Sequence, residues 1–247
     1  MNNKPQIKIL GYLITTSIDK LDLRGSRILV NTINQYSYCI SKKDKLFHEA
    51  LLNTDVLVPD GIGIVMAARL LKKGSVNRIT GSDLHEFLLK KLNEISGKVF
   101  YLGASSSTLK KIEDRLAKEY PKIEFDGYSP PYKAEFSAEE NNEMIAAVND
   151  FQPHVVFVGM TAPKQEKWAY QHKEQLNTNI IVSIGAAFDF YGGTVKRSPK
   201  WLQNIGLEWF FRLIQEPKRM WKRCVVTSTL FFYDIFRELI KKRENII

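Results

Sequence analysis

Short apolar runs alternate along the chain with longer segments in which apolar residues recur every three or four positions. The short runs are rich in Val, Ile, Leu and Phe and have few polar interruptions, which predicts buried strands. They lie at residues 27–32, 55–59, 98–103, 122–127, 154–159 and 179–185. The longer segments have the spacing of amphipathic helices. They lie at residues 43–53, 62–71, 82–95, 106–120, 137–151 and 163–176.

Regular alternation of strands and helices is typical of the α/β class. Strands that are apolar at nearly every position are buried on both faces, as in a parallel sheet covered by helices on each side. The pattern therefore predicts a Rossmann-like, mainly parallel sheet. The first 22 residues hold an apolar run that Gly11 and two threonines interrupt, without a small-residue cleavage site. This run predicts a strand rather than a signal peptide, and a cytoplasmic protein.

Charge is concentrated at the C-terminal end. The net charge of the 247-residue chain is +9, and residues 196–247 hold 12 Lys and Arg against 5 Asp and Glu. We therefore expect an α/β catalytic domain at 1–195 and a basic, aromatic helical appendage at 196–247. A basic patch attracts phosphate-rich partners such as nucleic acid, anionic lipid or a diphosphate substrate. The two cysteines, Cys39 and Cys224, are too few for a disulfide scaffold and fit a reducing compartment.

Polar residues follow several of the predicted strands. In parallel sheets, ligands bind beyond the carboxyl ends of the strands, so these residues are the first candidates for a site. Taken singly, each also fits ordinary turn chemistry. The candidates are Thr32, Asn34, Asp60, Gly61, Gly103, Lys164, Gln165 and Glu166.

Familiar cofactor and metal motifs are missing from the sequence. The segment "GIGIVM" has Met66 where a dinucleotide fingerprint needs its third glycine, and there is no Walker A motif. The four histidines are dispersed along the chain. We therefore expect no metal and no cofactor. No nucleic-acid-binding module is recognisable either, so nucleic acid is not an expected partner.

Five motifs, in order along the chain, resemble the WecG/TagA/CpsF glycosyltransferases, glycosyltransferase family 26. They are "TIN" at 32–34, "VPDGIGIV" at 58–65, "RITGSDL" at 78–84, "VGMTAPKQEKW" at 158–168 and the long "GAAFDFYGGTVKRSP…RMWKR" at 185–223. The resemblance implies inverting, metal-independent transfer of a sugar from a UDP-sugar to a polyprenyl-diphosphate-linked saccharide. The reaction belongs to surface polysaccharide synthesis at the inner membrane face. The donor sugar stays open among N-acetylmannosamine, its uronic acid and glucose.

The resemblance also implies roles for individual residues. Asp60 is the expected base for the acceptor hydroxyl, although an Asp that only caps the next helix would give the same sequence pattern. Arg78 is expected to stabilise the departing diphosphate, unless it is only a solvated surface arginine. Thr32 is placed with these two in the catalytic set, where it and Asn34 orient the sugar. Gly61, Gly103, Lys164, Gln165 and Glu166 complete the expected substrate-binding set.

The tail mixes aromatic with basic residues, as do helices that lie in a bilayer interface. Its longest charge-free run, 224–233, is too short to span a membrane, which takes about 20 apolar residues. Arg212 and Arg219 are seven residues apart, so they fall near the same helix face, and the resemblance suggests that both reach the diphosphate. The alternatives are a hairpin packed on the core, a homo-oligomer interface, or a non-catalytic docking subunit. The aromatic residues are Trp201, Trp209, Phe210, Phe211, Trp221, Phe231, Phe232 and Phe236.

Overall fold

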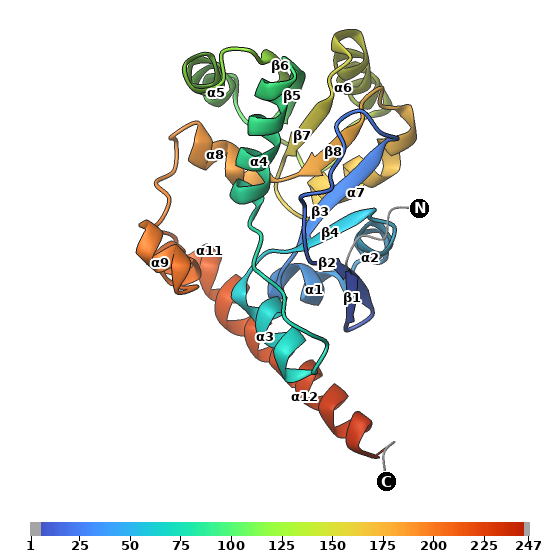
Figure 1. Cartoon of the computed structure of the whole chain (residues 1–247), viewed down its shortest axis with the longest axis vertical. Coiled ribbons are helices and arrows are strands. Elements are labelled where there is room, and N and C mark those ends of the chain that lie inside the picture. Colours follow the sequence, from blue (N-terminus) through green and yellow to red (C-terminus); the bar gives the residue numbers. More distant parts are fainter. Residues whose placement is uncertain (1–5, 245–247) are drawn as a thin grey trace.

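The computed structural model describes residues 6–244, apart from the side chains of residues 204, 219 and 242–244. A six-stranded sheet in the order β4-β3-β8-β7-β5-β6 forms its centre, and every neighbouring pair is parallel (Figure 1). All six predicted strands are present, which confirms the α/β class. Their bounds are β3 Ile28–Ile33, β4 Val56–Pro59, β5 Lys98–Gly103, β6 Glu124–Tyr128, β7 Val155–Gly159 and β8 Ile180–Ser183.

Helices cover both faces of this sheet. Successive residues of a strand point to opposite faces, so Val99 and Tyr101 of β5 pack with α4, α5 and α8, while Phe100 and Leu102 pack with α6 and α7. These side chains are fully buried, as the continuous apolar runs predict. The helices of the α/β part are α1 Gln35–Ser41, α2 Lys45–Leu52, α3 Ile62–Leu70, α4 Gly81–Glu94, α5 Ser106–Glu119, α6 Ala138–Phe151, α7 Lys164–His172 and α8 Gly185–Tyr191.

The N-terminal segment is a hairpin, which corrects the expectation of one strand. Strands β1 (Gln6–Ile9) and β2 (Tyr12–Thr15) pair antiparallel. The turn between them has positive φ at both central residues, 46° at Leu10 and 93° at Gly11. Such turns match the twist of paired strands. Gly11 therefore marks the turn of a two-stranded sheet that packs beside α1 and α2.

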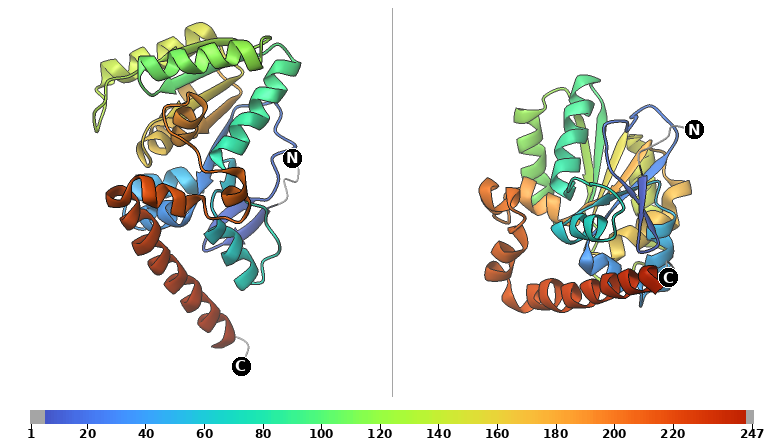
Figure 2. Two further views of the ribbon diagram at one scale, coloured as in Figure 1. Left: turned by 90° about the vertical axis from the view of Figure 1, so that its left-hand side faces the viewer. Right: turned by 60° about the horizontal axis from the view of Figure 1, so that its bottom comes forward.

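Helices also form the C-terminal segment. The elements are α9 Lys200–Asn204, α10 Glu208–Gln215, α11 Pro217–Trp221, a π-helical turn at Lys222–Val226, and α12 Thr227–Glu244. Both views of Figure 2 show α9 to α11 passing along one side of the sheet before α12 runs on as one long rod. Among the described residues, no helix combines the length and the hydropathy that crossing a bilayer requires.

The tail aromatics divide between the core and the surface. Phe231 of α12 is fully buried beside Tyr38 of α1, with 5.3 Å between ring centroids, so this part of the tail packs on the core. Trp201, Trp209 and Phe236 are exposed by 64%, 41% and 62%. The bilayer interpretation is therefore wrong for Phe231 and stays a prediction for the exposed residues. The division into domains at residue 195 and the oligomeric state also stay predictions.

Candidate active site

Asp60 lies at the carboxyl edge of the sheet, where two neighbouring strands end. Strand β4 stops at Pro59 beside Ile33 of β3, and the backbone N–H of Asp60 donates to the Ile33 carbonyl at 2.9 Å. Thr32 pairs in register with Val58 of β4 and is 9% exposed. The structure therefore brings two predicted site residues, Thr32 and Asp60, to one edge.

The backbone at Asp60 is set by the glycine after it. Gly61 has φ of 119° and is the N-cap of α3, so Asp60 precedes the cap, and the capping alternative for Asp60 is not what the structure shows. A Cβ on Gly61 would lie 3.2 Å from Gln35 Oε1 and 3.5 Å from Asn34 Cβ. The positive φ is the feature that favours glycine, because the two contacts are with the end of a flexible side chain and at an ordinary van der Waals distance. Gly61 thus allows the left-handed backbone turn that directly follows Asp60.

Asn34 has a structural task at this edge. Its Oδ1 accepts hydrogen bonds from the Ser37 backbone N–H at 3.0 Å and from the Ser37 hydroxyl at 3.1 Å, which caps α1. A contact between Asn34 and a substrate would therefore come from its amide nitrogen. The predicted substrate role of Asn34 stays a prediction.

The electrostatic surroundings of Asp60 come from segments far apart in the sequence. Burial, and next the Glu208 carboxylate, raise the pKa of Asp60 to about 6 against the opposing effect of Arg78 and Arg212. Asp83 raises this pKa further. A carboxylate with a pKa near 6 is ionised at neutral pH and still a better base than an ordinary Asp. The arrangement suits Asp60 to accept a proton.

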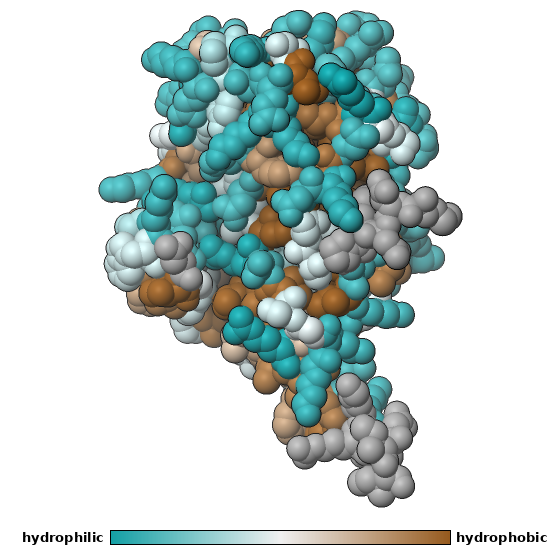
Figure 3. All heavy atoms as spheres, in the orientation of Figure 1, coloured by the Kyte–Doolittle hydropathy of each residue, from teal (hydrophilic) through white to brown (hydrophobic). Residues whose placement is uncertain are grey.

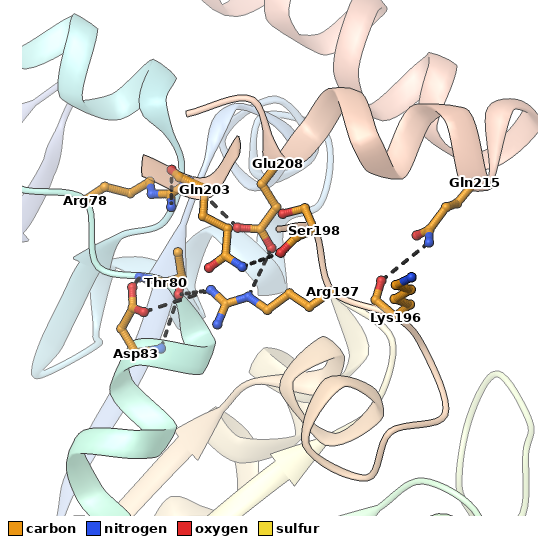
Figure 4. A network of polar contacts seen from close by, with 9 residues as sticks. All are labelled: Arg78, Thr80, Asp83, Lys196, Arg197, Ser198, Gln203, Glu208 and Gln215. Carbon is orange, nitrogen blue, oxygen red and sulfur yellow. Dashed lines mark hydrogen bonds and ion pairs between the residues drawn. The ribbon is translucent and has the colours of Figure 1, made fainter. Parts of the chain in front are cut away.

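Arg78 is held by the C-terminal segment. Its Nη2 donates to the Gln203 carbonyl at 3.0 Å, and its Nη1 lies 3.8 Å from Glu208 Oε2 (Figure 4). The Arg78 side chain is 20% exposed. It is therefore not the solvated surface arginine of the alternative interpretation, because two residues of the tail hold it beside Asp60.

The sequence interpretation missed a second arginine at this site. Arg197 Nη2 donates to the Thr80 hydroxyl at 3.3 Å and lies 3.9 Å from Asp83 Oδ1, while its Nε lies 3.6 Å from Glu208 Oε1. Figure 4 shows Glu208 between the ends of Arg78 and Arg197. The only signal in the sequence is the presence of Arg197 and Glu208 within the long C-terminal motif.

Arg212 joins this cluster from α10. Its guanidinium carbon lies 5.5 Å from the centroid of the Phe190 ring, and its charge acts on Asp60. The suggestion from the resemblance, that Arg212 reaches the diphosphate, stays a prediction. The side chain of Arg219, the other predicted tail arginine, lies outside the described residues.

Gln165 and Glu166 form a second polar group, at the start of α7. They are 5% and 3% exposed, and Gln165 Nε2 donates to Glu166 Oε1 at 2.9 Å. Burial raises the pKa of Glu166 to about 7, against the opposing hydrogen bond from Gln165. Their other side-chain oxygens are buried without a hydrogen-bond partner in the part of the chain that the structure describes. Gly185 makes room for them, since a Cβ there would lie 2.6 Å from Gln165 Oε1.

Lys164 and Gly103 have contacts that lead away from Asp60. Lys164 Nζ donates to the Lys133 carbonyl at 2.6 Å and lies 3.8 Å from the centroid of the Phe136 ring. Gly103 ends β5 with φ of 127°, and a Cβ on it would lie 2.2 Å from the carbonyl oxygen of Gly159 in β7. Close contact between strands explains this glycine without a ligand. The substrate roles of both residues stay predictions.

Among residues 6–244 with described side chains, no three His, Cys, Asp or Glu side chains gather as metal ligands. The expectation that the protein works without a metal is not tested by this observation. The chemistry that the arrangement itself offers is one basic carboxylate beside three arginines.

Comparison with known proteins shows which sequences this chain resembles. The sequence model of the "Glycosyl transferase WecG/TagA/CpsF family" matches residues 12–245. A Bacillus subtilis (strain 168) protein is 33% identical over 197 residues, which are 80% of this chain and 75% of that protein. A Bacillus spizizenii protein is 33% identical over 216 residues, 87% and 80% of the two chains. A Staphylococcus aureus (strain MW2) protein is 26% identical over 210 residues, 85% and 80%. All three are named N-acetylglucosaminyldiphosphoundecaprenol N-acetyl-beta-D-mannosaminyltransferase.

Proposed function

Because the chain belongs to the WecG/TagA/CpsF family of glycosyltransferases, we propose that it transfers N-acetylmannosamine from its UDP derivative to a polyprenyl-diphosphate-linked N-acetylglucosamine. The names of the relatives support both the sugar and the acceptor. The product would feed the synthesis of a bacterial surface polysaccharide. The observation that carries the proposal is Asp60, a carboxylate with a pKa near 6 beside Arg78 and Arg212.

The chemistry follows from this arrangement. The Asp60 carboxylate accepts the proton of the acceptor hydroxyl as that oxygen bonds to the anomeric carbon of the donor. The bond between the anomeric carbon and the diphosphate breaks on the opposite face, and its electron pair leaves with UDP. Arg78 and Arg212 offset the charge that grows on the departing diphosphate. Attack on the face opposite the leaving group inverts the anomeric configuration.

Exposed apolar residues of the tail and of α3 support docking on a membrane. Phe210 and Ile214 of α10 are exposed by 46% and 65%, and Met66 of α3 by 43%. Figure 3 shows apolar surface gathering over α9, α3 and α12. Aromatic and basic residues together favour the surface of an anionic bilayer. We infer that the protein binds peripherally at the inner face of the plasma membrane, where the lipid-linked acceptor is found.

Measurement of UDP release tests this proposal. The purified protein is incubated with polyprenyl-diphosphate-N-acetylglucosamine and, in separate reactions, with the UDP derivatives of N-acetylmannosamine, N-acetylmannosaminuronic acid, N-acetylglucosamine and glucose. We expect acceptor-dependent release only with the first donor. Release with another donor would change the assigned sugar. No release with any donor would favour the alternative of a non-catalytic docking subunit.

A second experiment separates catalysis from docking. Arg212→Ala, alone and with Arg219→Ala, is assayed with a short-chain, water-soluble acceptor that does not require a membrane. If the arginines serve the diphosphate, the rate falls at least tenfold while the variant still sediments with anionic vesicles. A rate within a few-fold of the unmodified protein would restrict these arginines to docking.

A further inference from the structure

The charged groups around Asp60 balance one another in the ligand-free protein. Three acidic and three basic side chains form the cluster through ion pairs and through their effects on the pKa of Asp60. At neutral pH a diphosphate would add two or three negative charges to this balanced group. Its entry would be more favourable if one of the acidic groups moved away from the arginines. The cluster consists of Asp60, Asp83, Glu208, Arg78, Arg197 and Arg212.

Glu208 is the acidic group that contacts the arginines as a phosphate would. It is the first residue of α10, and its side chain is 15% exposed. Oε2 lies 3.8 Å from Arg78 Nη1, and Oε1 lies 3.6 Å from Arg197 Nε, so the carboxylate bridges the two guanidinium groups. Asp60 and Asp83 differ from it in position, since Asp60 directly follows β4 and Asp83 forms the capping box of α4 with Thr80. Glu208 comes from the tail and is the one that can withdraw without breaking a helix cap.

The bridge leaves the arginines incompletely satisfied. Both distances exceed the range of about 2.7–3.2 Å that N–H···O hydrogen bonds normally have. Arg197 Nε is buried and has no hydrogen-bond partner among the described residues. A diphosphate carries more oxygens and more charge than a carboxylate, and guanidinium groups bind phosphate oxygens in a bidentate manner. The site therefore matches a diphosphate better than it matches Glu208.

We propose that Glu208 stands in for a phosphate of the nucleoside diphosphate in the ligand-free protein, and that binding of the ligand displaces it from Arg78 and Arg197. Arg197 then becomes a direct ligand of the diphosphate, beside Arg78. The identity of the ligand rests on the proposed function, whereas the exchange of one anion for another rests on the ion pairs alone. Because Glu208 begins α10, the exchange also links occupancy of the site to the position of this helix.

A different role for Glu208 gives the opposite expectation. If Glu208 only clamps the tail onto the site, its loss loosens the arginines and weakens diphosphate binding. If it competes with the diphosphate, its loss strengthens binding. The sign of the change in affinity therefore separates the two roles.

Calorimetric titration of Glu208→Gln measures this sign. We expect the Kd for UDP to fall about five- to twentyfold and the Kd for uridine, which has no phosphate, to stay unchanged. Glu238→Gln is the matched control, because it removes the same charge from an exposed position on α12, and its Kd for UDP should equal that of the unmodified protein. An unchanged or higher Kd for UDP in folded Glu208→Gln would overturn the proposal. If that variant does not fold, Glu208→Asp withdraws the carboxylate by one methylene and should lower the Kd in the same direction.

A double-mutant cycle tests the part of Arg197. Arg197→Gln should raise the Kd for UDP, and in this background Glu208→Gln should lower the Kd by less than it does in the unmodified protein, because only the competition for Arg78 remains. If Glu208→Gln increases the affinity for UDP as much without Arg197 as with it, Glu208 does not compete for this arginine. That result would overturn the assignment of Arg197 as a ligand of the diphosphate.

Titration with pyrophosphate keeps the failure of this proposal apart from failure of the proposed function. Tighter pyrophosphate binding in Glu208→Gln, without UDP release from any sugar donor, would support the anion exchange and remove the proposed function. Sugar transfer by a protein whose affinities for UDP and pyrophosphate do not change in Glu208→Gln would instead support the proposed function and overturn the anion exchange.

Discussion

Replacing Asp60 by Asn should make the protein more stable and nearly inactive. The pKa of Asp60 is about 6 in the folded protein against an ordinary value of 3.8, so the folded state holds the proton of this carboxyl more tightly than the unfolded state does. Between these two pH values the folded protein binds more protons, and its stability falls as pH rises. At neutral pH this cost is fully present. The Asp60→Asn substitution would remove it, because an amide does not ionise.

The size of the gain follows from the shift in pKa. About two pKa units at 1.36 kcal/mol each correspond to about 3 kcal/mol at pH 7.5, and the same linkage leaves only about 0.5 kcal/mol at pH 4. The attraction from Arg78 and Arg212 is already contained in the shifted pKa. Allowing for imperfect replacement of the carboxyl by an amide, we expect Asp60→Asn to raise the free energy of unfolding by about 1–3 kcal/mol at pH 7.5. Loss of a general base should lower turnover by about two to four orders of magnitude.

Urea unfolding at pH 7.5 and pH 4, with UDP release measured in parallel, tests both parts of this prediction. Asp150→Asn, at an exposed position on α6, is the control and should change neither stability nor turnover. A gain in stability that does not depend on pH, or a loss at pH 7.5, would refute the electrostatic argument. Turnover close to that of the unmodified protein in folded Asp60→Asn would refute the assignment of the base.

Three further predictions follow from the same structure. Since Asp60 must be ionised to accept a proton, kcat/KM should fall about tenfold per pH unit below a midpoint near 6; a flat profile from pH 5 to 8 would contradict this. Phe231→Ala should lower the free energy of unfolding by about 3–5 kcal/mol because that ring is fully buried. The matched change at Phe236, which is 62% exposed, should stay within about 0.5 kcal/mol in the same urea titration. Transfer activity should be equal with and without EDTA, and a strict requirement for Mg²⁺ or Mn²⁺ would show that arginines alone do not neutralise the leaving group.

The sheet could be predicted from sequence because strands that are buried on both faces are apolar at nearly every position. Five of the six strands, all except the edge strand β6, are almost wholly buried, and a polar side chain buried in them needs a partner inside the protein, as Asn31 has in Thr54. Two short helices, α1 and α8, were not predicted. Helix α1 begins at a capping asparagine that the sequence interpretation took for a sugar ligand, and α8 begins at a glycine that the apolar run of β8 had absorbed.

The candidate site divides in the same way. Asp60 and Thr32 could be found because topology alone brings the carboxyl ends of β3 and β4 together. Arg197 and Glu208 could not be identified, because they belong to the site through contacts with residues such as Arg78 and Thr80 that are distant in the chain. A pattern of local spacing does not contain such pairings. The tail was as hard to predict, since burial of Phe231 and exposure of Phe236 depend on which face of α12 meets α1.

The catalytic base and the residues around the anion site come from different parts of the chain, which has a chemical consequence. The base belongs to the end of a rigid strand, whereas Arg197, Glu208 and Arg212 belong to the basic tail. Burial of Asp60 is the largest contribution to its raised pKa, and the Glu208 carboxylate is the next. Withdrawal of Glu208 frees Arg78 and Arg197 for phosphate oxygens, and it removes one negative charge that raises the pKa of Asp60. A diphosphate that takes its place brings at least as much negative charge, so the pKa of Asp60 stays raised while the leaving group is bound. The exchange of anions therefore retains the charge environment that makes Asp60 a stronger base than an ordinary Asp.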